Sequence, residues 1–221
     1  MAKVTVVLLN WKRSKQLHDK IIPSIASQTV KPKIYLWNND DEKFHHPEVT
    51  WQIDSSRNKR CFPRWFMASM ADTEFVCSLD DDVMFADNRV LEDMIAYYRK
   101  NADAHGRIAG SHGVILMPDK TYKRSAHVAT DGKGDLRVDV VKGRFMFFRT
   151  ALLNKVSFIA DTTEDDIKLC SNIAERRRRY HVVPSFLHNR LRDLPELGVA
   201  LCEVHGQAGT RNDAAKRFFD W

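Results

Sequence analysis

The sequence predicts an α/β fold with a mixed, mostly parallel central sheet flanked by helices. Residues 4–9 form a continuous run rich in β-branched residues that is bounded by Asn10, as in a strand buried on both faces of a parallel sheet. A second run, residues 33–37, follows a helical stretch and completes a β-α-β unit. Polar residues follow both runs, and ligands of open α/β sheets bind beyond the carboxyl ends of the strands.

Length and composition suit one α/β domain spanning residues 1–221, because 43% of the residues are apolar. No run approaches the roughly eighteen apolar residues of a membrane helix, and the N-terminal segment becomes polar too early for a signal peptide. We expect a soluble, cytoplasmic protein without a membrane span, either complete or one domain of a larger protein. The four cysteines lack a Cys-x-x-Cys pair and are expected to be core thiols.

The net charge of +6 includes a basic run at residues 176–179. Such a run can bind nucleic acid, but no aromatic residues alternate with these arginines to stack on bases. A solvated helix face or a helix C-terminus is the preferred interpretation, and we expect no nucleic-acid partner.

The first half of the fold, residues 1–103, is expected to bind a nucleotide-type ligand. Apolar residues recur there at helical spacing, and short runs rich in β-branched and aromatic residues indicate strands. In order, the further expected elements are a helix at 14–27, a strand at 50–53, a helix at 63–71, a strand at 74–79 and a helix at 89–101. In the second helix we expect the bulky side chains Trp65, Phe66, Met67 and Met70 to face the core.

The second half, residues 104–221, is expected to begin with two strands separated by a polar excursion. This excursion, residues 119–137, is expected to form a hairpin or a mobile loop near the site. A later helix is expected to begin at Thr162 or Thr163, with acidic residues in its first turn. The expected elements are strands at 108–117 and 139–149, the helix at 162–178, a strand at 180–184 and a terminal helix at 212–221.

Three consecutive aspartates, Asp80, Asp81 and Asp82, directly follow the expected strand 74–79. Neighbouring carboxylates repel one another, and an Asp-x-Asp pair at a strand tip can hold a divalent cation that bridges a diphosphate. A solvated turn or a helix N-terminus is the alternative interpretation. The position beyond a strand end favours a nucleotide-sugar site.

Four motifs, taken in chain order, add to this interpretation. They are Val-Val-Leu-Leu-Asn-Trp-Lys-Arg at 6–13, Leu-Trp-Asn-Asn at 36–39, Leu-Asp-Asp-Asp-Val at 79–83 and Glu-Asp-Asp-Ile at 164–167. Together they resemble the GT-A class of glycosyltransferases, and most closely the C-terminal catalytic domain of the exostosin family. The resemblance covers nearly the whole chain. It implies a single GT-A domain with a donor-binding first half and an acceptor-binding second half.

The resemblance implies a metal-dependent transfer from a UDP-sugar donor to a saccharide or glycoprotein acceptor. Asp82 would ligate the metal, Asp80 would face the ribose or a metal-bound water, and Asp81 would belong to the donor site. Hard oxygen ligands suit Mn²⁺ or Mg²⁺, and an imidazole would favour manganese. His188 matches the position of a late histidine in many GT-A enzymes, with His181 and His205 as weaker candidates.

Asp165 and Asp166 are the catalytic candidates, at a helix N-terminus that favours ionised carboxylates. If the enzyme inverts, Asp166 is the natural general base; if it retains, as the exostosin resemblance implies, this carboxylate orients the acceptor or stabilises oxocarbenium character. Alternatively, one of the two aspartates has no catalytic role and only places a negative charge at the N-terminus of the helix.

Further donor contacts are expected from strand tips and arginines. A guanidinium can bind phosphate oxygens with two hydrogen bonds, and a glycine allows close backbone approach to the sugar. The candidates are Asn10, Arg13, Asn38, Arg57, Arg60, Arg64, Gly143 and Arg211. Arg211 lacks the tryptophan and histidine that precede the corresponding arginine of the exostosin family.

Some features depart from the exostosin pattern. The segment from Arg57 to Asp80 fits it only with an insertion and reads as well against the broad family 2 transferases, so the stereochemistry stays open. A sugar-phosphate nucleotidyltransferase is an alternative, although no Gly-x-Gly-x-Arg loop follows the first strand. A non-catalytic glycan-binding module is another, but a pure binder has no need for clustered carboxylates.

Overall fold

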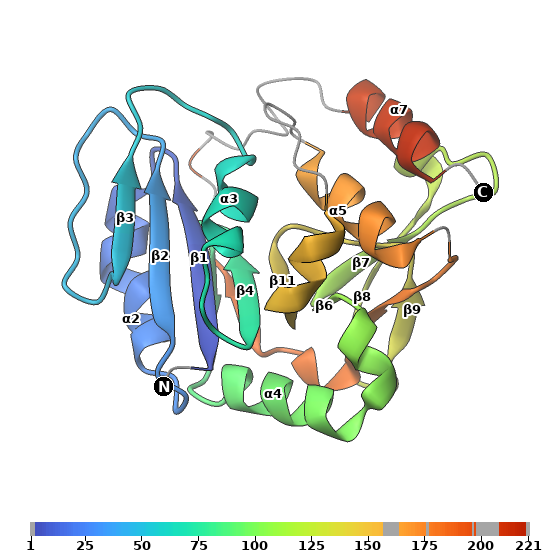
Figure 1. The fold of residues 1–221 in the computed structure, drawn as a ribbon, viewed down its shortest axis with the longest axis horizontal. Coiled ribbons are helices and arrows are strands. Elements are labelled where there is room, and N and C mark those ends of the chain that lie inside the picture. Colours follow the sequence, from blue (N-terminus) through green and yellow to red (C-terminus); the bar gives the residue numbers. More distant parts are fainter. Residues whose placement is uncertain (1–2, 157–163, 176, 196, 198–207, 220–221) are drawn as a thin grey trace.

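The main sheet confirms the predicted α/β class (Figure 1). The computed structural model describes residues 3–156, 164–175, 177–195, 197 and 208–219. Within these residues the strands of the main sheet run in the order β3-β2-β1-β4-β11-β6-β12-β9. The strands are β1 Val4–Asn10, β2 Lys33–Asn38, β3 Trp51–Asp54, β4 Phe75–Leu79, β6 Ala109–Gly110, β9 Leu136–Val138, β11 Phe145–Arg149 and β12 His181–Val183. Strands β1 to β4 are mutually parallel, whereas β11 and β9 run antiparallel to their neighbours.

Both faces of β1 and β4 are buried, as the composition of residues 4–9 predicts for β1. Successive β1 side chains point to opposite faces, so Val6 and Leu8 join one core cluster and Val7 joins another. The first cluster includes a continuous helical segment formed by α1 Ser14–Gln16, the π-helical η1 Leu17–Ile21 and α2 Ile22–Ala26. The second includes α3 Pro63–Ser69. The sheet is therefore the middle of three layers.

In helix α3, only some of the bulky apolar residues are buried. Trp65 and Met67 are buried as predicted, but Phe66 is 41% exposed and Met70 is 55% exposed. Residues four apart lie on the same side of a helix, so Phe66 and Met70 share the more exposed face of α3, where the Phe66 ring makes an edge-on contact with Trp37 in β2. The expectation that all four bulky residues face the core is wrong for these two.

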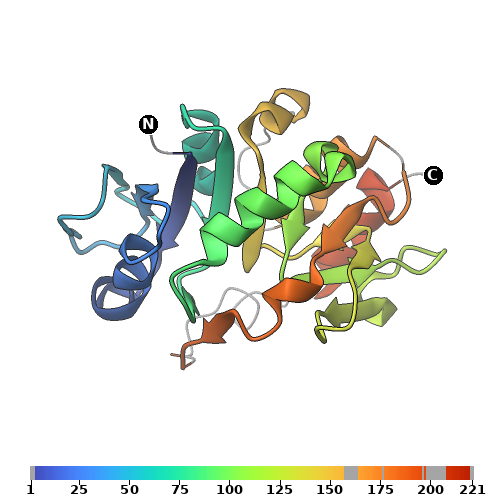
Figure 2. The same cartoon turned by 90° about the horizontal axis from the view of Figure 1, so that it is seen from below.

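The helix α4 Val90–Lys100 confirms the predicted helix 89–101. Its apolar positions Leu91, Met94, Ile95 and Tyr98 are buried in the first cluster. Figure 2 shows α4 crossing the underside of the molecule, at the end opposite to the carboxyl ends of the parallel strands.

Each of the two strands predicted after residue 104 is divided between two sheets. β6 and β11 belong to the main sheet, while β7 His112–Ile115 and β10 Val140–Val141 pair in a smaller sheet with β8 Ala126–Ala129. The breaks fall at Ser111 and at residues 142–144. The excursion 119–137 contains η3 Tyr122–Arg124 as well as β8 and β9.

A further two-stranded sheet was not predicted. It pairs β5 Val83–Phe85, directly after the aspartates, with β13 Leu191–Asp193. Each strand has only three residues, too few for a period of two to be recognised. Short 3₁₀ segments complete the chain: η2 Ala102–Gly106, η4 Thr150–Lys155 and η5 Ser185–Leu187.

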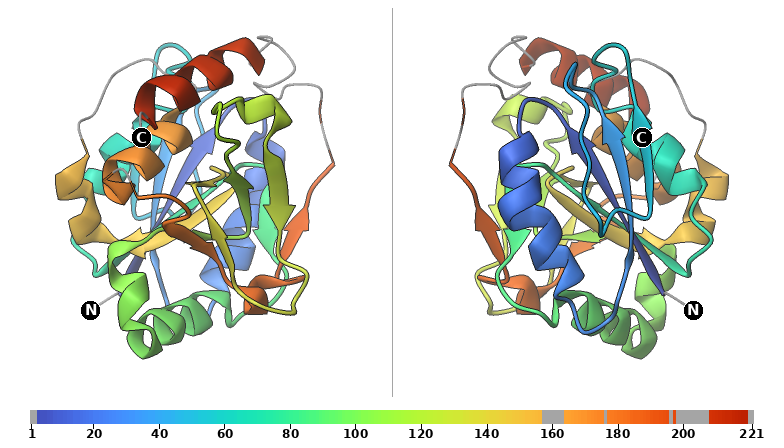
Figure 3. Two further views of the ribbon diagram at one scale, coloured as in Figure 1. Left: turned by 90° about the vertical axis from the view of Figure 1, so that its right-hand side faces the viewer. Right: turned by 90° about the vertical axis from the view of Figure 1, so that its left-hand side faces the viewer.

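The acidic helix α5 Asp165–Ala174 lies beneath α7 Ala208–Phe218 (Figure 3). α5 is shorter than predicted because Glu175 adopts a left-handed conformation with φ 50°, which ends the helix. Its expected start at Thr162 or Thr163 lies outside the described residues. α7 begins earlier than the predicted residue 212. None of the helices in the described part of the chain has the length and apolar character needed to cross a membrane.

Candidate functional site

Parallel pairing brings two strand ends together at one edge of the sheet. Leu8 of β1 pairs with Leu79 of β4, so the turn after β1 lies beside the aspartates. β11 runs in the opposite direction and begins at Phe145, which pairs with Leu79. Gly143, just before β11, therefore reaches the same edge as the polar ends of β1 and β4.

The three aspartates form the turn from β4 into β5 and differ in accessibility. The side chains of Asp80 and Asp82 are 32% and 28% exposed, whereas that of Asp81 is 19% exposed. Asp81 accepts a hydrogen bond from the Trp11 backbone N–H at 3.1 Å. Asp80 and Asp82 are therefore better placed than Asp81 to meet a ligand.

Arg13 is buried against the aspartates. Its Nε lies 3.4 Å from Asp81 Oδ1 and its Nη2 lies 3.8 Å from Asp82 Oδ2. Burial raises the pKa of the Asp81 carboxyl to about 7; Arg13 opposes this shift, and the charges of Asp80 and Asp82 add to it. A cation bound near Asp80 and Asp82 would relieve this repulsion.

Arg64, on α3, is buried between the aspartate turn and the acidic helix. Its Nη2 donates to Asp80 Oδ1 at 2.7 Å, and its Nη1 donates to the Gly143 carbonyl at 2.9 Å. Its Nε lies 3.5 Å from Asp165 Oδ2. The pKa of Arg64 is raised because the charges of Asp80 and Asp165 outweigh the effect of burial, so the guanidinium stays charged.

Asp166 is fully engaged as an acceptor. Arg211 Nη2 lies 2.9 Å and 2.7 Å from its two oxygens. The backbone N–H of Ile167 donates to Oδ1 at 2.8 Å, and that of Gly143 donates to Oδ2 at 3.3 Å. The same Arg211 nitrogen donates to the Tyr122 hydroxyl at 2.9 Å. The structure thus brings Asp166, Gly143 and Arg211, which were separate candidates in the sequence, into contact, and adds Tyr122.

Asp165 is about as buried as Asp166 but makes fewer hydrogen bonds within the described part of the chain. Only 6% of the residue is exposed, and its Oδ2 has no hydrogen-bond partner among the described residues. Burial raises the pKa of Asp165, with Asp166 and Asp80 adding to the shift and Arg64 opposing it. Asp165 Oδ2 therefore faces Arg64 Nε at 3.5 Å as an ion pair without a hydrogen bond.

Asp165→Asn is expected to stabilise the protein at pH 8. The raised pKa means that the folded state holds this proton more tightly than the unfolded state, so the free energy of unfolding falls as the pH rises from about 4 towards the folded-state pKa. We expect the variant to match the wild type near pH 4 and to exceed it by about 1–2 kcal/mol at pH 8. Urea unfolding across this range measures the difference. A variant less stable at pH 8 would show that the ion pair with Arg64 outweighs burial.

Gly143→Ala is expected to displace Arg64. A Cβ at this position would lie 2.8 Å from Arg64 Nη1, closer than atoms normally approach. We expect a loss of about 1–3 kcal/mol in the free energy of unfolding and lower activity, because a buried guanidinium has little room to move. Gly134→Ala is the matched control, since no atom lies within 4 Å of its added Cβ. Equal effects from both variants would contradict the prediction.

Asn10 and Asn38 lie at the expected strand tips, but their side chains are taken up inside the fold. The Asn10 amide donates to Asn38 Oδ1 at 2.8 Å, and Asn10 Oδ1 accepts from the Arg13 backbone N–H at 3.3 Å. Both residues are 0% exposed. In this structure they fix the ends of β1 and β2, which positions Arg13.

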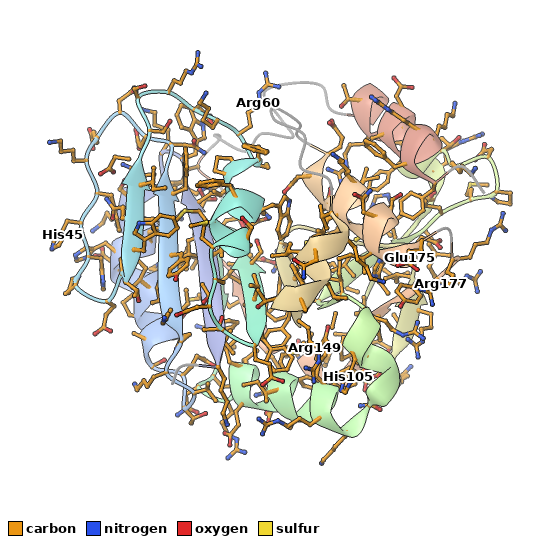
Figure 4. The ribbon with its side chains drawn as sticks, in the orientation of Figure 1. His45, Arg60, His105, Arg149, Glu175 and Arg177 are labelled. Carbon is orange, nitrogen blue, oxygen red and sulfur yellow. The ribbon has the colours of Figure 1, made fainter. Side chains whose placement is uncertain are left out.

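Arg57 and Arg60 lie in the exposed loop after β3. Figure 4 shows Arg60 beyond the carboxyl ends of the parallel strands. Asn39 holds this loop, since its Oδ1 accepts from the Lys59 backbone N–H at 2.8 Å and its amide donates to the Arg60 carbonyl at 3.0 Å. Both arginines are thus free to approach a ligand at this edge.

The histidine candidates lie elsewhere. His188 is exposed, and its Nδ1 lies 3.0 Å from the Thr130 carbonyl. His181 is fully buried, with one ring nitrogen accepting from the Ile108 backbone N–H and the other facing the Cys170 carbonyl. His205 lies outside the described residues. Within the described part of the chain, no three His, Cys, Asp or Glu side chains converge as a metal site, so His188 does not join the aspartates here.

The two more accessible aspartates have the donor chemistry that a divalent cation would need. Asp80 and Asp82 offer hard oxygen donors of the kind that Mn²⁺ and Mg²⁺ prefer. The ion pairs at this edge set three arginines, Arg13, Arg64 and Arg211, against five aspartates, so negative charge remains in excess among these groups. A nucleotide would have to supply further oxygen ligands.

Two residues of this site were not predicted from the sequence. Tyr122 comes from the polar excursion, where an isolated tyrosine gives no signal of its partner. Cys61 was expected to be a core thiol; it is a half-buried free thiol whose raised pKa reflects burial and the charges of Asp165 and Asp80. Cys77 and Cys170 are buried free thiols as predicted, and Cys202 lies outside the described residues.

Comparisons place the fold but not a family. The sequence matches no known family profile and no curated protein. The structure is similar to the crystal structure of S. aureus TarS 1–349 in complex with UDP-GlcNAc, with a TM-score of 0.55 and 16% identity, covering 83% of this chain and 56% of that chain. For a second crystal structure of TarS 1–349 the values are 0.53, 15%, 83% and 58%. The chain spans little more than half the length of these proteins, and at this identity the likeness shows a shared fold.

Proposed function

We propose that this protein is a metal-dependent glycosyltransferase that moves a sugar from a UDP-sugar to a saccharide or glycoprotein acceptor. One observation carries the proposal: Asp80 and Asp82 are accessible at the edge where β1 and β4 end, beside the buried Arg13. The shared fold supports it, because TarS has been crystallised with UDP-GlcNAc. The order of the four GT-A motifs agrees with this assignment.

The chain's own residues supply most of the required chemistry. A bound Mn²⁺ or Mg²⁺, held by Asp82 and Asp80, would stabilise the negative charge that develops on the leaving diphosphate. Arg13 keeps the aspartate turn in place, and the exposed Arg57 and Arg60 are the cations available to bind phosphate oxygens.

The acidic start of α5 serves the acceptor side. Asp165 is held beside Arg64, and Asp166 is oriented by Arg211 and backbone N–H groups. We favour retention of the anomeric configuration, in line with the exostosin resemblance. Held in a fixed orientation by these contacts, Asp166 would orient an acceptor or stabilise positive charge on the departing sugar.

The proposal is tested by measuring hydrolysis of a panel of UDP- and GDP-sugars with Mn²⁺ and without acceptor. We expect one UDP-sugar to be hydrolysed and the GDP-sugars to be left intact. Calorimetry provides the second measurement: a transferase should bind UDP only when Mn²⁺ is present. Binding of glycans without any response to nucleotide would identify a glycan-binding module instead.

A further inference from the structure

We propose that Arg64 is a positioning residue that fixes the aspartate turn and the acidic helix start at a set distance, and that it does not bind the diphosphate. The inference rests on the proposed transferase function, because it assigns Arg64 a task in that reaction. Its position in the sequence made Arg64 a donor-binding candidate, whereas its contacts in the fold point to a different task.

Arg64 contacts three separate elements. Its Nη2 bonds Asp80 after β4, its Nη1 bonds the Gly143 carbonyl before β11, and its Nε faces Asp165 at the start of α5. A planar guanidinium can reach in these directions at once, whereas a lysine ammonium is a single point charge on a flexible chain. Arg64 is thus built into the junction of these elements.

Burial separates Arg64 from the exposed arginines. Its side chain is 7% exposed, and its Nε is one of the buried atoms without a hydrogen-bond partner among the described residues. A diphosphate would need open access to the guanidinium, as Arg57 and Arg60 provide. In this structure the Arg64 charge is directed at Asp80 and Asp165 instead.

The two carboxylates need this shared cation. Arg64 lies between them, with Nη2 2.7 Å from Asp80 Oδ1 and Nε 3.5 Å from Asp165 Oδ2. Without Arg64 the two carboxylates would repel across the site. Since Asp80 faces the donor and Asp165 the acceptor side, their separation sets how the reacting groups meet, and misplacement by about 1 Å can cost around a hundredfold in rate.

The test compares Arg64→Lys, Asp165→Asn and the double variant with the wild type. We expect Arg64→Lys to lower kcat for sugar transfer by about a hundredfold and to leave UDP affinity at saturating Mn²⁺ within about threefold. If Arg64 acts through Asp165, the double variant should be no more than about threefold slower than the slower single variant. Losses that multiply would show independent roles and overturn the proposal.

Arg149→Lys is the matched control. Arg149 also has a buried Nε, pairs with Glu74 and lies over the Phe75 ring, but it is at the far end of β11, well away from Arg60 in Figure 4. We expect this variant to keep the wild-type kcat. UDP titration gives the folded, binding-competent fraction of each variant, so that misfolding is not counted as a loss of kcat.

Two outcomes would overturn the assignment directly. A tenfold or larger fall in UDP affinity with unchanged uridine affinity would make Arg64 a diphosphate ligand. Unchanged kcat in Arg64→Lys would make it a structural residue only. If Arg64→Lys fails to fold, Gly143→Ala perturbs the same guanidinium from the other side.

A failure of the proposed function can be recognised separately. If the wild type neither binds UDP with Mn²⁺ nor hydrolyses UDP-sugars, the transferase assignment fails. The same four proteins can then be compared by thermal unfolding without metal or nucleotide, where direct coupling between Arg64 and Asp165 should make the stability changes non-additive. Additive stability changes in this thermal unfolding comparison would show that Arg64 and Asp165 are not coupled, which would overturn the positioning role.

Discussion

Asp82→Asn is expected to lower the rate of sugar transfer by about a thousandfold, which corresponds to several kcal/mol of transition-state stabilisation. The change removes one charge at an accessible position while keeping nearly the same side-chain volume. The Asp82 side chain is 28% exposed and its ion pair with Arg13 Nη2 is long, at 3.8 Å, so the isosteric variant should keep its fold. We therefore expect metal-dependent UDP binding to be lost and the unfolding temperature to change little.

Calorimetry with UDP and Mn²⁺, together with transfer assays over a range of Mn²⁺ concentrations, measures these effects. Asp72→Asn is the control, because Asp72 is 67% exposed and pairs with Lys33 away from the aspartate turn. Normal turnover of Asp82→Asn at saturating Mn²⁺ would refute the metal assignment. Partial recovery at high Mn²⁺ would support it, because a weakened site can still be filled by mass action.

The strands and helices of the first half were predictable because each depends on a local pattern. Buried strands such as β1 and β4 are short runs made mainly of apolar and β-branched residues, and the aspartates follow β4 in sequence. The division of residues 108–117 between two sheets was not predictable. The strands with which β6 and β7 pair decide the sheet to which each belongs, and these pairings are not a local property of the sequence. The inward face of α3 was also ambiguous, because Phe66 is as apolar as Trp65.

The site was predictable in its residue types but not in its pairings. The position of an arginine in the sequence shows that it lies near a strand end. It does not show whether its guanidinium is buried in the core or exposed to solvent. Arg64 faces the core side of α3, whereas Arg60 lies in an exposed loop three residues before that helix. The pairing of Arg211 with Asp166 joins residues 45 apart in sequence, and only the packing of α7 on α5 brings them together.

Asp166→Asn is expected to separate catalysis from donor binding. Asp166 is 4% exposed and lies at the start of α5, whereas the candidate metal ligands lie in the turn after β4. We expect UDP affinity to stay within about twofold while transfer falls by about a hundredfold or more, the usual scale for losing a positioned catalytic carboxylate. Glu175→Gln, at the other end of α5, is the matched control for loss of one negative charge.

The contact with Arg211 decides how this result is interpreted. Asp166→Asn leaves the mostly buried Arg211 without its carboxylate partner, so a loss of about 1–3 kcal/mol in the free energy of unfolding is expected as well. A general base should matter less for slow donor hydrolysis than for transfer, so a loss confined to transfer would assign proton abstraction to Asp166. If both activities fall alike and the product keeps the anomeric configuration of the donor, Asp166 stabilises positive charge on the departing sugar. Loss of UDP binding would place it with the metal, and normal turnover with lower stability would leave it as the structural partner of Arg211.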